Sequence, residues 1–470
     1  MQRIFAILIC FTIIVSYYIY NIRSSNFLPV IGKTVSNIKK QQWGTCWSFS
    51  AISTLESSIL TSGLQHTTDL SEYHLDKYNG FNRDGFSTDP KKDWYSTQGK
   101  GFQGSNTDAL NSGLMVHLGG DFTVAAAYLS NTKGAVEEYK TPSILTHKDF
   151  DKFGNTPTTG VLLENNYEYI YPQRIEWLTT TGTDSEKRDV IKEYIRKFGS
   201  VSSAQYMTDT PIGFHKNKEV HLNLTTTKPN HAINIVGWDD DFNYRGHIGA
   251  WIIKDSDHID DKTGEKISFY YIPYDDLITA KDPKMGGVSF NSPKKREGLV
   301  TIRTHALHGW RFNIDSYESI KNHFRTSNDK EELIGIGVYI PTVNTKSKIA
   351  IKVNGKTIGL KKELVAKFPG FYYIDVDAYT IDPNSQIEVT QSNDSKVYAL
   401  DSSSKMDVLL SSNKFEISPQ TIESKALKNQ SFLLRNGKWI DLQDMEQDPN
   451  INYKRANFPI NLYTKKRLLQ

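Results

Sequence analysis

The sequence contains very little cysteine. Its only two cysteines are Cys10 and Cys46, and Cys10 lies within an apolar N-terminal segment. The rest of the chain therefore has a single thiol, so no disulfide bond can form within it. A lone cysteine is most often a small buried hydrophobic residue, but it can also be a nucleophile, and its surroundings decide between the two.

The sequence also lacks a cluster of charge of one sign. Its 56 lysines and arginines and 53 aspartates and glutamates give a formal net charge of +3, and the basic residues are spread along the chain. Nucleic-acid binding needs a basic patch or run that contacts phosphates. The composition therefore argues against a nucleic-acid partner.

One uncharged apolar run stands at the N-terminus, from Ile4 to Tyr20. It is at the short end for a membrane span and long for a signal-peptide core, and no small-x-small cleavage site follows it. We therefore favour an uncleaved anchor within residues 1–25 over a cleaved signal. Basic residues such as Arg23 pull the following side towards the cytoplasm, but large folded domains are exported largely regardless of flanking charge. We expect a protein that faces outside the cytoplasm, either membrane-anchored or secreted.

The remaining chain is long enough for two domains with separate cores. We place a first domain at residues 26–292, a linker at 293–300, where the run SPKKREG is charged and turn-forming, and a second domain at 301–470. Beyond the linker the pattern changes to short alternating segments with turns, such as KIAIKV and KTIGL around Asn354-Gly355. This spacing predicts an all-β sandwich.

Cys46 follows a Gly-Thr turn in the stretch QQWGTCWSFSAISTLESSIL. Beyond it, Ile52, Leu55 and Ile59 recur at helical spacing, which predicts a helix that starts at the cysteine and buries one face. The positive end of a helix dipole favours a thiolate, and a thiolate beside a base is a nucleophile at neutral pH. Gly44 also allows close backbone approach to the thiol. These features favour a catalytic cysteine over a merely packed one.

A base and a carboxylate occur in two later segments. The runs HAINIVGW and GAWIIKDS have the composition of short β-strands, and a loop rich in Asp, Asn and Gly separates them. His231 and Asp255 have residue 243, inside that loop, as their midpoint, so in an antiparallel hairpin they lie roughly opposite each other. A carboxylate in that position orients an imidazole and stabilises its protonated form. Most histidines are solvated or structural, but the matched carboxylate sets His231 apart.

Two further segments carry information. Gly119 and Gly120 precede a predicted helix that contains Ala126 and Leu129. The glycines either form a simple turn or leave backbone open for hydrogen bonds to an extended peptide. Residues 183–199 show the clearest amphipathic pattern in the chain, with a capping box at the start and a glycine stop, which predicts a scaffold helix.

Several of these segments resemble the papain family of cysteine peptidases. The similarity is strongest in GTCWSFS around Cys46, in HAINIVGW at His231 and in IIKDS at Asp255, and it is weaker at the glycine pair. The resemblance implies an α+β, two-lobed papain-like fold. It implies that Cys46 is the nucleophile, that His231 transfers the proton and that Asp255 orients the imidazole.

The same resemblance implies residues for the oxyanion and the substrate. In the family an upstream glutamine helps to form the oxyanion hole, and here this is Gln41 or Gln42. The choice stays open because the interval from Gln41 to Cys46 is one residue shorter than the family's. The residues implied to contact the substrate are Gly119, Gly120 and Trp47.

Two positions near the proposed base depart from the family pattern. Asp255 stands where the family has asparagine, which is physically reasonable because a carboxylate stabilises imidazolium better than an amide does. Asp257 stands where the family has a tryptophan that shields the histidine contact. Loss of that shield is expected to admit water to the contact between His231 and Asp255, unless another residue covers it.

The C-terminal half resembles the lectin-like domain of clostridial-type bacterial cell-surface cysteine proteases. The resemblance implies a task in placement, with a glycan or surface molecule as the partner. We expect residues 301–470 to fold alone and to be dispensable for cleavage of a short peptide, because no proposed catalytic group lies beyond Asp255. The alternative is a domain that merely braces the first one.

The sequence thus predicts a thiol-dependent endopeptidase that hydrolyses peptide bonds in proteins, with no metal and no other cofactor. One rival is a different Cys-His-Asp acyl-transfer enzyme, such as a transglutaminase or a cell-wall amidase, but those families do not share the GTCWSFS and HAINIVGW pairing. A second rival is a protease-derived surface binding protein with weak or no catalysis. Asp257 and the shortened interval from Gln41 favour that second rival.

Overall fold

The computed structural model describes most of the chain. The described residues are 26–41, 44–81, 113–114, 119–138, 168–208, 210–225, 228–257, 269–296, 300–407, 419–446 and 448–467. Among them, no helix combines the length and the apolar character needed to cross a membrane. The predicted anchor, residues 1–25, lies outside the described part.

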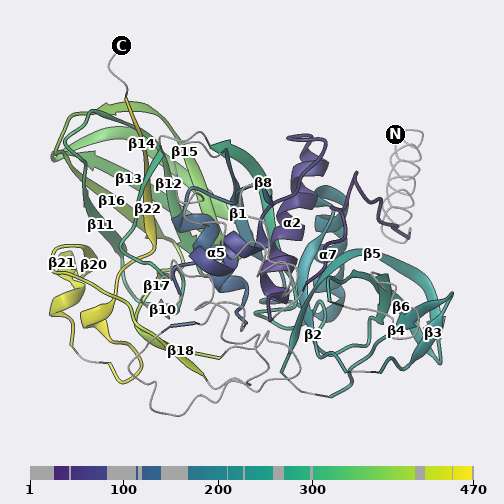
Figure 1. The fold of residues 1–470 in the computed structure, drawn as a ribbon. Coiled ribbons are helices and arrows are strands. Elements are labelled where there is room, and N and C mark those ends of the chain that lie inside the picture. The colour runs from purple at the N-terminus through teal and green to yellow at the C-terminus, as the bar shows by residue number, and fades with distance from the viewer. Residues whose placement is uncertain are drawn as a thin grey trace, which may run out of the picture.

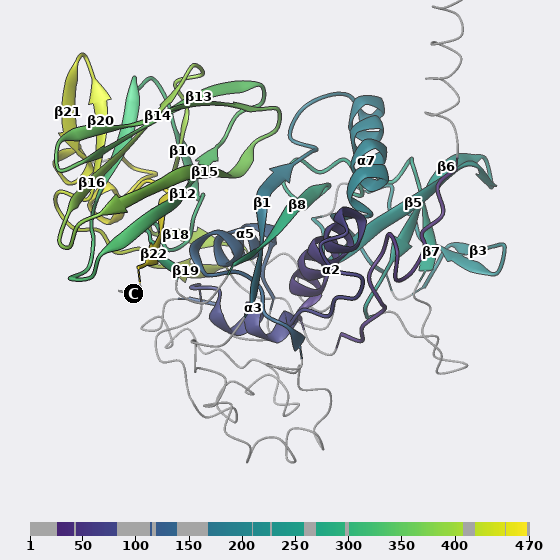
Figure 2. The same ribbon diagram turned by 90° about the horizontal axis from the view of Figure 1, so that it is seen from above.

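The helices occupy the middle of the molecule, between strands of the N-terminal half on one side and strands of the C-terminal half on the other (Figures 1 and 2). The helices in the described part of the chain are α2 (Cys46–Ser62), α3 (Glu72–Tyr78), α5 (Phe122–Asn131) and α7 (Asp184–Phe198). The strands of the N-terminal half are β1 (Tyr169–Trp177), β2 (Val201–Gln205), β3 (Gly213–His215), β4 (Lys218–Val220), β5 (His231–Tyr244), β6 (His247–Lys254), β7 (Phe269–Pro273) and β8 (Val288–Arg296).

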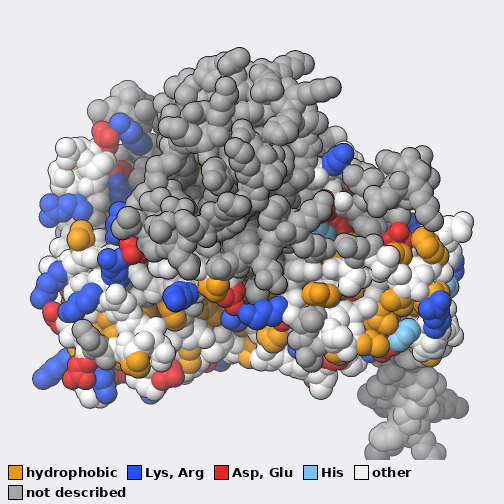
Figure 3. Space-filling view, turned by 60° about the horizontal axis from the view of Figure 1, so that its bottom comes forward, with side chains coloured by type: hydrophobic (Ala, Val, Ile, Leu, Met, Phe, Trp, Pro, Cys, Tyr) orange, Lys and Arg blue, Asp and Glu red, His pale blue; other side chains and the backbone are white. Residues whose placement is uncertain are grey.

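The C-terminal half is built almost entirely of strands. These are β9 (Val300–Arg303), β10 (Phe312–Ile314), β11 (Ser319–Arg325), β12 (Glu331–Ile340), β13 (Thr345–Val353), β14 (Lys356–Ala366), β15 (Gly370–Ile381), β16 (Gln386–Asn393), β17 (Tyr398–Leu400), β18 (Ser404–Met406), β19 (Gln420–Ile422), β20 (Ser431–Arg435), β21 (Lys438–Asp441) and β22 (Ile460–Lys466). Two short 3₁₀ helices, η5 (Leu442–Asp444) and η6 (Tyr453–Arg455), lie between the last strands. On the face shown in Figure 3, described lysines and arginines are intermixed with acidic residues.

Helix α2 begins at Cys46, as predicted, but it buries more than one face. Every residue from Cys46 to Ile59 is buried, because α2 packs against α3, α5, α7, β2, β5 and β8. The hydroxyl groups on the polar face of the helix form hydrogen bonds with neighbouring strands. Ser50 Oγ donates to the Ile233 carbonyl at 2.7 Å, and Thr54 Oγ1 lies 2.7 Å from Ser202 Oγ. The expectation that the helix buries only one face is wrong. Its serine and threonine side chains can be buried as well, because their hydroxyl groups find hydrogen-bond partners on the strands.

The predicted scaffold helix is confirmed as α7. The Thr183 hydroxyl accepts from the Glu186 N–H, the Glu186 carboxylate accepts from the Thr183 N–H, and Gly199 follows the last turn. This is the capping box expected from the sequence. The predicted helix after Gly119 and Gly120 is also present, as α5.

A single sheet runs through both halves. Its strand order is β3-β4-β7-β6-β5-β2-β8-β1-β15-β12-β22-β9, so β1 pairs with β8 on one side and with β15 on the other. The sequence signal for a linker covers part of this sheet, since residues 293–296 form the end of β8. The lysines of this run suggested an exposed linker, but in the strand each has an acidic partner. Lys294 Nζ lies 2.8 Å from Asp375, and Lys295 Nζ lies 2.9 Å from Glu168. The domain boundaries themselves stay a prediction.

A second sheet covers the C-terminal part of the first. Its order is β14-β13-β16-β11-β20-β21, and the two sheets enclose one cluster of buried apolar residues that includes Ile336, Ile351 and Val389. The hairpin predicted at Asn354-Gly355 is present. Both turn residues have positive φ, +49° and +79°, as a two-residue hairpin turn requires. The C-terminal half thus has a core of its own.

The two halves also share a second core. Tyr339, Phe371 and Tyr463 from the C-terminal strands belong to the same buried cluster as Cys46 and Ile52 of α2. The seam between the two halves is the pair of strands β1 and β15, in which Glu176 pairs with Gly370. A Cβ atom at position 370 would lie 1.9 Å from the Ile175 carbonyl oxygen, so the strands meet too closely for any side chain there.

We expect Gly370→Ala to lower the free energy of unfolding by about 3 kcal/mol, because the new methyl group forces β15 away from β1. Chemical denaturation measures this change. The matched control is Gly355→Ala, where φ is also positive but nothing lies within 4 Å of the new methyl group. The control should lose only about 1 kcal/mol. Equal losses in the two variants would show that the seam does not matter for stability.

Candidate active site

Cys46 is the first residue of α2, and its side chain is almost fully buried. Thr45 precedes the helix without a side-chain cap, so the positive end of the helix dipole acts directly at the cysteine. Ser50, one turn further along, is anchored to the carbonyl of Ile233 in β5. That bond fixes the start of α2 beside the strand that begins with His231.

The structure brings His231 and Asp255 into contact. His231 Nε2 lies 3.0 Å from Asp255 Oδ1 and 2.9 Å from Oδ2. His231 opens β5, and Asp255 directly follows the last residue of β6. The two residues are not opposite each other in the ladder. The turn falls at Arg245-Gly246, beyond the predicted midpoint at residue 243. Two irregularities along the hairpin correct most of this offset, so that Asn234 pairs with Lys254 and the register lies two residues from the predicted one.

The same imidazole interacts with the thiol. His231 makes a side-chain hydrogen bond to Cys46. Because Asp255 occupies Nε2, the nitrogen that remains for the thiol is Nδ1. Three side chains from distant parts of the chain therefore form one line, from Cys46 through His231 to Asp255.

The charges of this line stabilise one another. Burial alone would lower the pKa of His231, but the charge of Asp255 and hydrogen bonds to Asp255 and Cys46 raise it well above 6.5. Burial would raise the pKa of Asp255, but the charge of His231 and hydrogen bonds from His231, the Asp257 N–H and Tyr270 hold it well below 3.8. The imidazole is therefore held protonated against an ionised carboxylate.

Tyr270 covers the carboxylate, and the sequence analysis missed it. Its hydroxyl donates to Asp255 Oδ2 at 2.8 Å and accepts from Gln205 Nε2 at 2.6 Å, and the His221 ring packs on it at 4.8 Å. The Asp255 side chain is 0% exposed. Tyr270 thus buries Asp255 from bulk solvent, although the family tryptophan is replaced by Asp257. Tyr270 belongs to the run KISFYYIPYDD, where one of several aromatic residues gives no local signal of this role.

Gln41 lies beside the residue that follows Asp255. The Gln41 N–H donates to the Ser256 carbonyl at 2.8 Å, and the Ser256 hydroxyl donates to Gln41 Oε1 at 3.0 Å. These bonds fix the amide, with the oxygen held by Ser256 and the nitrogen as the donor end. Gln42, the alternative oxyanion residue, lies outside the described residues.

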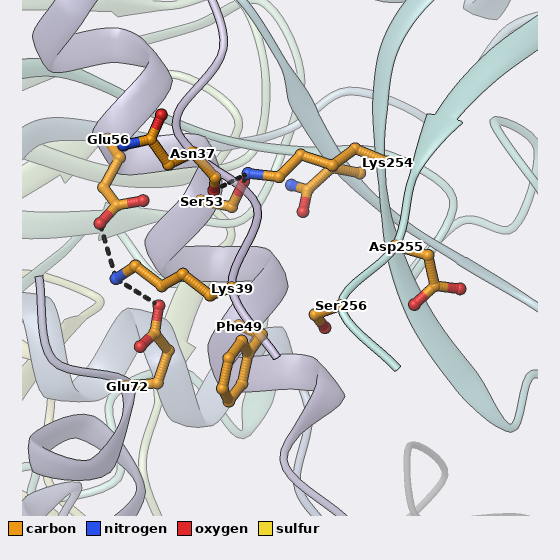
Figure 4. A pocket seen from close by; sticks show the side chains of 10 residues that line it. Asn37, Lys39, Phe49, Ser53, Glu56, Glu72, Lys254, Asp255 and Ser256 are labelled. Carbon is orange, nitrogen blue, oxygen red and sulfur yellow. Dashed lines mark hydrogen bonds and ion pairs between the residues drawn. The ribbon is translucent and has the colours of Figure 1, made fainter. Parts of the chain in front are cut away.

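The segment that carries Gln41 is held by two lysines, of which Lys254 is buried and Lys39 is partly buried. Lys254 Nζ donates to Ser36 Oγ and Ser53 Oγ and to the Asn37 carbonyl, each at 2.9 Å. Lys39 Nζ lies within 2.9 Å of carboxylate oxygens of Glu56, Asp69 and Glu72. Figure 4 shows both lysines, with Ser53, Glu56 and Glu72, around a small polar cavity that reaches Asp255 and Ser256. The residues around this cavity hold the segment that carries Gln41 in place.

Glu72 is the electrostatically strained member of this support. Burial raises its pKa; Lys39 opposes the shift, and Glu56 and Glu138 add to it. The resulting pKa is about 8. The raised pKa reflects burial and the crowding of several carboxyl groups around the one ammonium of Lys39.

The residues predicted to contact substrate have a clear packing role. Trp47 is fully buried, and Gly119 and Gly120 are buried as well. A Cβ atom on Gly120 would lie 2.6 Å from the Trp47 ring, so glycine is needed there for the tryptophan to fit. Their contact with substrate stays a prediction.

Comparison with solved structures identifies the fold. The clostridial cysteine protease Cwp84, after propeptide cleavage, superposes with a TM-score of 0.67 and 20% identity over 92% of this chain and 97% of that one. The fold is that of Cwp84. A structure of the cysteine protease and lectin-like domains of Cwp84, a surface-layer-associated protein of Clostridium difficile, gives a TM-score of 0.66 at 20% identity, covering 93% and 90% of the two chains. No family model and no curated protein matches the sequence.

This likeness confirms a mixed α+β, papain-like protease fold with an attached β-rich domain. At 20% identity it speaks for the fold and leaves the chemistry to the residues of this chain. Those residues place a thiol, an imidazole and a carboxylate in one buried line.

We expect Tyr270→Phe to lower kcat for peptide cleavage by about tenfold with little change in KM, because Asp255 loses one charge-assisted hydrogen bond. Steady-state kinetics measure both constants. Tyr271→Phe is the matched control, since Tyr271 is the adjacent buried tyrosine. Similar kinetics for the two variants would remove Tyr270 from the site.

We expect thermal stability to fall as pH rises above about 6.5, because the raised pKa of His231 contributes stability that is lost as pH passes through its folded-state value. Asp255→Asn should lose this component, since the carboxylate causes the shift. Calorimetry of both proteins from pH 5 to 9 gives the difference curve. Glu72, whose pKa of about 8 adds a similar fall, is common to both and cancels. Parallel curves would contradict the assignment.

Proposed function

We propose that this protein is a thiol-dependent endopeptidase that cleaves peptide bonds in proteins. The observation that carries the proposal is the buried line from Cys46 through His231 to Asp255, at the start of the central helix of a papain-like fold. A protonated imidazole beside a thiol at a helix N-terminus is the arrangement that prepares a thiolate nucleophile.

The proposed reaction has two steps, the acylation of Cys46 and the hydrolysis of the resulting thioester. Cys46 Sγ attacks the carbonyl carbon, and the oxyanion is held by the Cys46 N–H and the Gln41 amide nitrogen. His231 gives its proton to the leaving amine as the C–N bond breaks. Water then attacks the thioester while His231 takes its proton, which releases the acid and restores the pair. Asp255 keeps the imidazole in the required orientation throughout.

Two features of the site argue against the alternative hypothesis that the protein is an inactive binding protein. That rival rested on Asp257, which replaces a shielding residue, and on the shortened interval from Gln41. Tyr270 supplies the missing cover for Asp255, and Gln41 is anchored to Ser256 despite the shorter interval. Both reasons for expecting weak catalysis therefore lose force.

The setting and partners of this activity are part of the same proposal. The similar protein Cwp84 is described as surface-layer associated and as having a lectin-like domain. We extend to this chain a location outside the cytoplasm, with an N-terminal anchor or as a secreted protein, and a glycan or surface partner for the C-terminal half. The apolar run from Ile4 to Tyr20 supports export.

We expect an epoxide or fluoromethyl-ketone thiol inhibitor to label Cys46 at one equivalent per chain and to abolish peptide cleavage. Mass spectrometry of the labelled peptide gives the site and the stoichiometry. Cys46→Ala should show neither labelling nor turnover while its circular dichroism spectrum stays unchanged, because a small side chain replaces a small one. Turnover that survives in Cys46→Ala would refute the mechanism, and a wild-type protein that resists labelling would favour the binding protein.

A further inference from the structure

Helix α5 is the element that follows the two predicted substrate-binding glycines. Asp121, next to Gly120, caps it: the Asp121 carboxylate accepts from the Thr123 and Val124 N–H groups at 2.8 and 3.0 Å and from the Thr123 hydroxyl. Gly119, Gly120 and the first turn of α5 thus form one continuous unit. Gly120 in turn packs on Trp47, the neighbour of Cys46. Any group that fixes the start of α5 also fixes the glycine pair.

The end of α5 is held at the seam between the halves. Arg296 Nη1 donates to the carbonyls of Thr132 and Lys133 at 3.3 and 3.1 Å. Its guanidinium lies over the rings of three tyrosines, with centroid distances of 3.7 Å (Tyr171), 4.6 Å (Tyr463) and 5.6 Å (Tyr373). A cation at this end of a helix is favourable.

The C-terminal half adds hydrogen bonds to the last turn of α5. Asn461 Nδ2 donates to the Ser130 carbonyl at 2.9 Å, and Tyr339 Oη lies 2.9 Å from Ser130 Oγ. Asn131 Nδ2 donates to the carbonyls of Ala306 and Leu307 at 3.0 and 2.8 Å. The end of α5 is therefore held by β12, by β22 and by the loop after β9, all of which follow residue 300 in the sequence or begin there.

Arg311 of the C-terminal half contacts the start of α5. Its Nη1 donates to Thr123 Oγ1 at 3.3 Å. Its Nε and Nη2 both donate to Ser404 Oγ at 3.2 Å, its guanidinium lies 5.7 Å from the centroid of the Phe81 ring, and its backbone N–H donates to the Leu400 carbonyl. Arg311 thus connects two strands of the C-terminal half to the helix turn that carries Asp121.

We propose that Arg311 is a positioning residue through which the C-terminal half holds Gly119 and Gly120 in place for an extended peptide substrate. The inference rests on the proposed peptidase function. It replaces the expectation that residues 301–470 are dispensable for cleavage of a short peptide. The C-terminal half then has two tasks, since its own core can support a surface partner while its inner strands complete the peptide site.

This role separates peptide docking from thiol chemistry. Arg311 contacts α5, whereas Cys46 and His231 are held by α2, β5 and Asp255. Loss of Arg311 should therefore weaken the binding of an extended peptide and leave the reactivity of the thiol unchanged.

The test compares Arg311→Ala with Arg325→Ala, an exposed arginine in β11 of the same half. For a peptide that spans both sides of the cleaved bond, we expect Arg311→Ala to raise KM about tenfold with kcat nearly constant, the loss of about one charge-assisted hydrogen bond. Inactivation by iodoacetamide, which needs only the reactive thiol, should keep its wild-type rate. Thr123→Val removes, at constant volume, the hydroxyl that links Arg311 to the Asp121 carboxylate, and it should reproduce part of the KM increase even if Arg311→Ala folds poorly.

Hydrogen exchange supplies a readout that is independent of activity. The amides at positions 123 and 124 should exchange faster in Arg311→Ala and Thr123→Val and at the wild-type rate in Arg325→Ala. Unchanged exchange at these amides, an unchanged KM, or a parallel fall in kcat and iodoacetamide reactivity would overturn the inference. A wild-type protein that iodoacetamide cannot inactivate would instead refute the proposed function, while the exchange rates would still decide the role of Arg311.

Discussion

The contact between His231 and Asp255 is buried, and that burial imposes conditions on much of the surrounding fold. An ionised pair in the interior is tolerated only when the remaining lone pairs and protons find partners. Asp255 meets this condition with the imidazole of His231, the N–H of Asp257 and the hydroxyl of Tyr270. Those partners come from β5, from the residues after β6 and from β7. The register of three strands is therefore fixed around one carboxylate.

The position of α2 answers the same demand from the other side. A thiol can approach the imidazole only if the helix start lies against β5, and the bond from Ser50 to the Ile233 carbonyl holds it there. The lysines Lys39 and Lys254 then hold the segment before Cys46 to α2, α3 and β6. Buried charges recur in this support, which is costly in isolation and stable here because each lysine has several acceptors.

The junction between the halves shows how the β-rich domain is joined to the part of the chain that carries the candidate site. The sheet continues from β1 to β15, and Arg296 lies among tyrosines from both halves while it binds the end of α5. The C-terminal half still has its own apolar core between two sheets. A domain that has its own apolar core and also continues the sheet of the first half can bind a separate partner and also shape the neighbouring site.

Local signals in the sequence determined the parts of the structure that depend on neighbouring residues. The capping box at Thr183, the Asn354-Gly355 hairpin and the start of a helix at Cys46 all follow from turn chemistry and periodicity over a few positions. The spacing of His231 and Asp255 also predicted their contact, although the turn lies at Arg245-Gly246 and the two residues are not directly paired in the ladder. Tertiary structure alone decided the rest: Tyr270 as the cover of Asp255, the burial of the polar face of α2 and the pairing of residues 293–296 in β8. These features depend on partners far away in the chain, such as Asp375 for Lys294, and the energy of such pairings leaves no trace in the local pattern of residues.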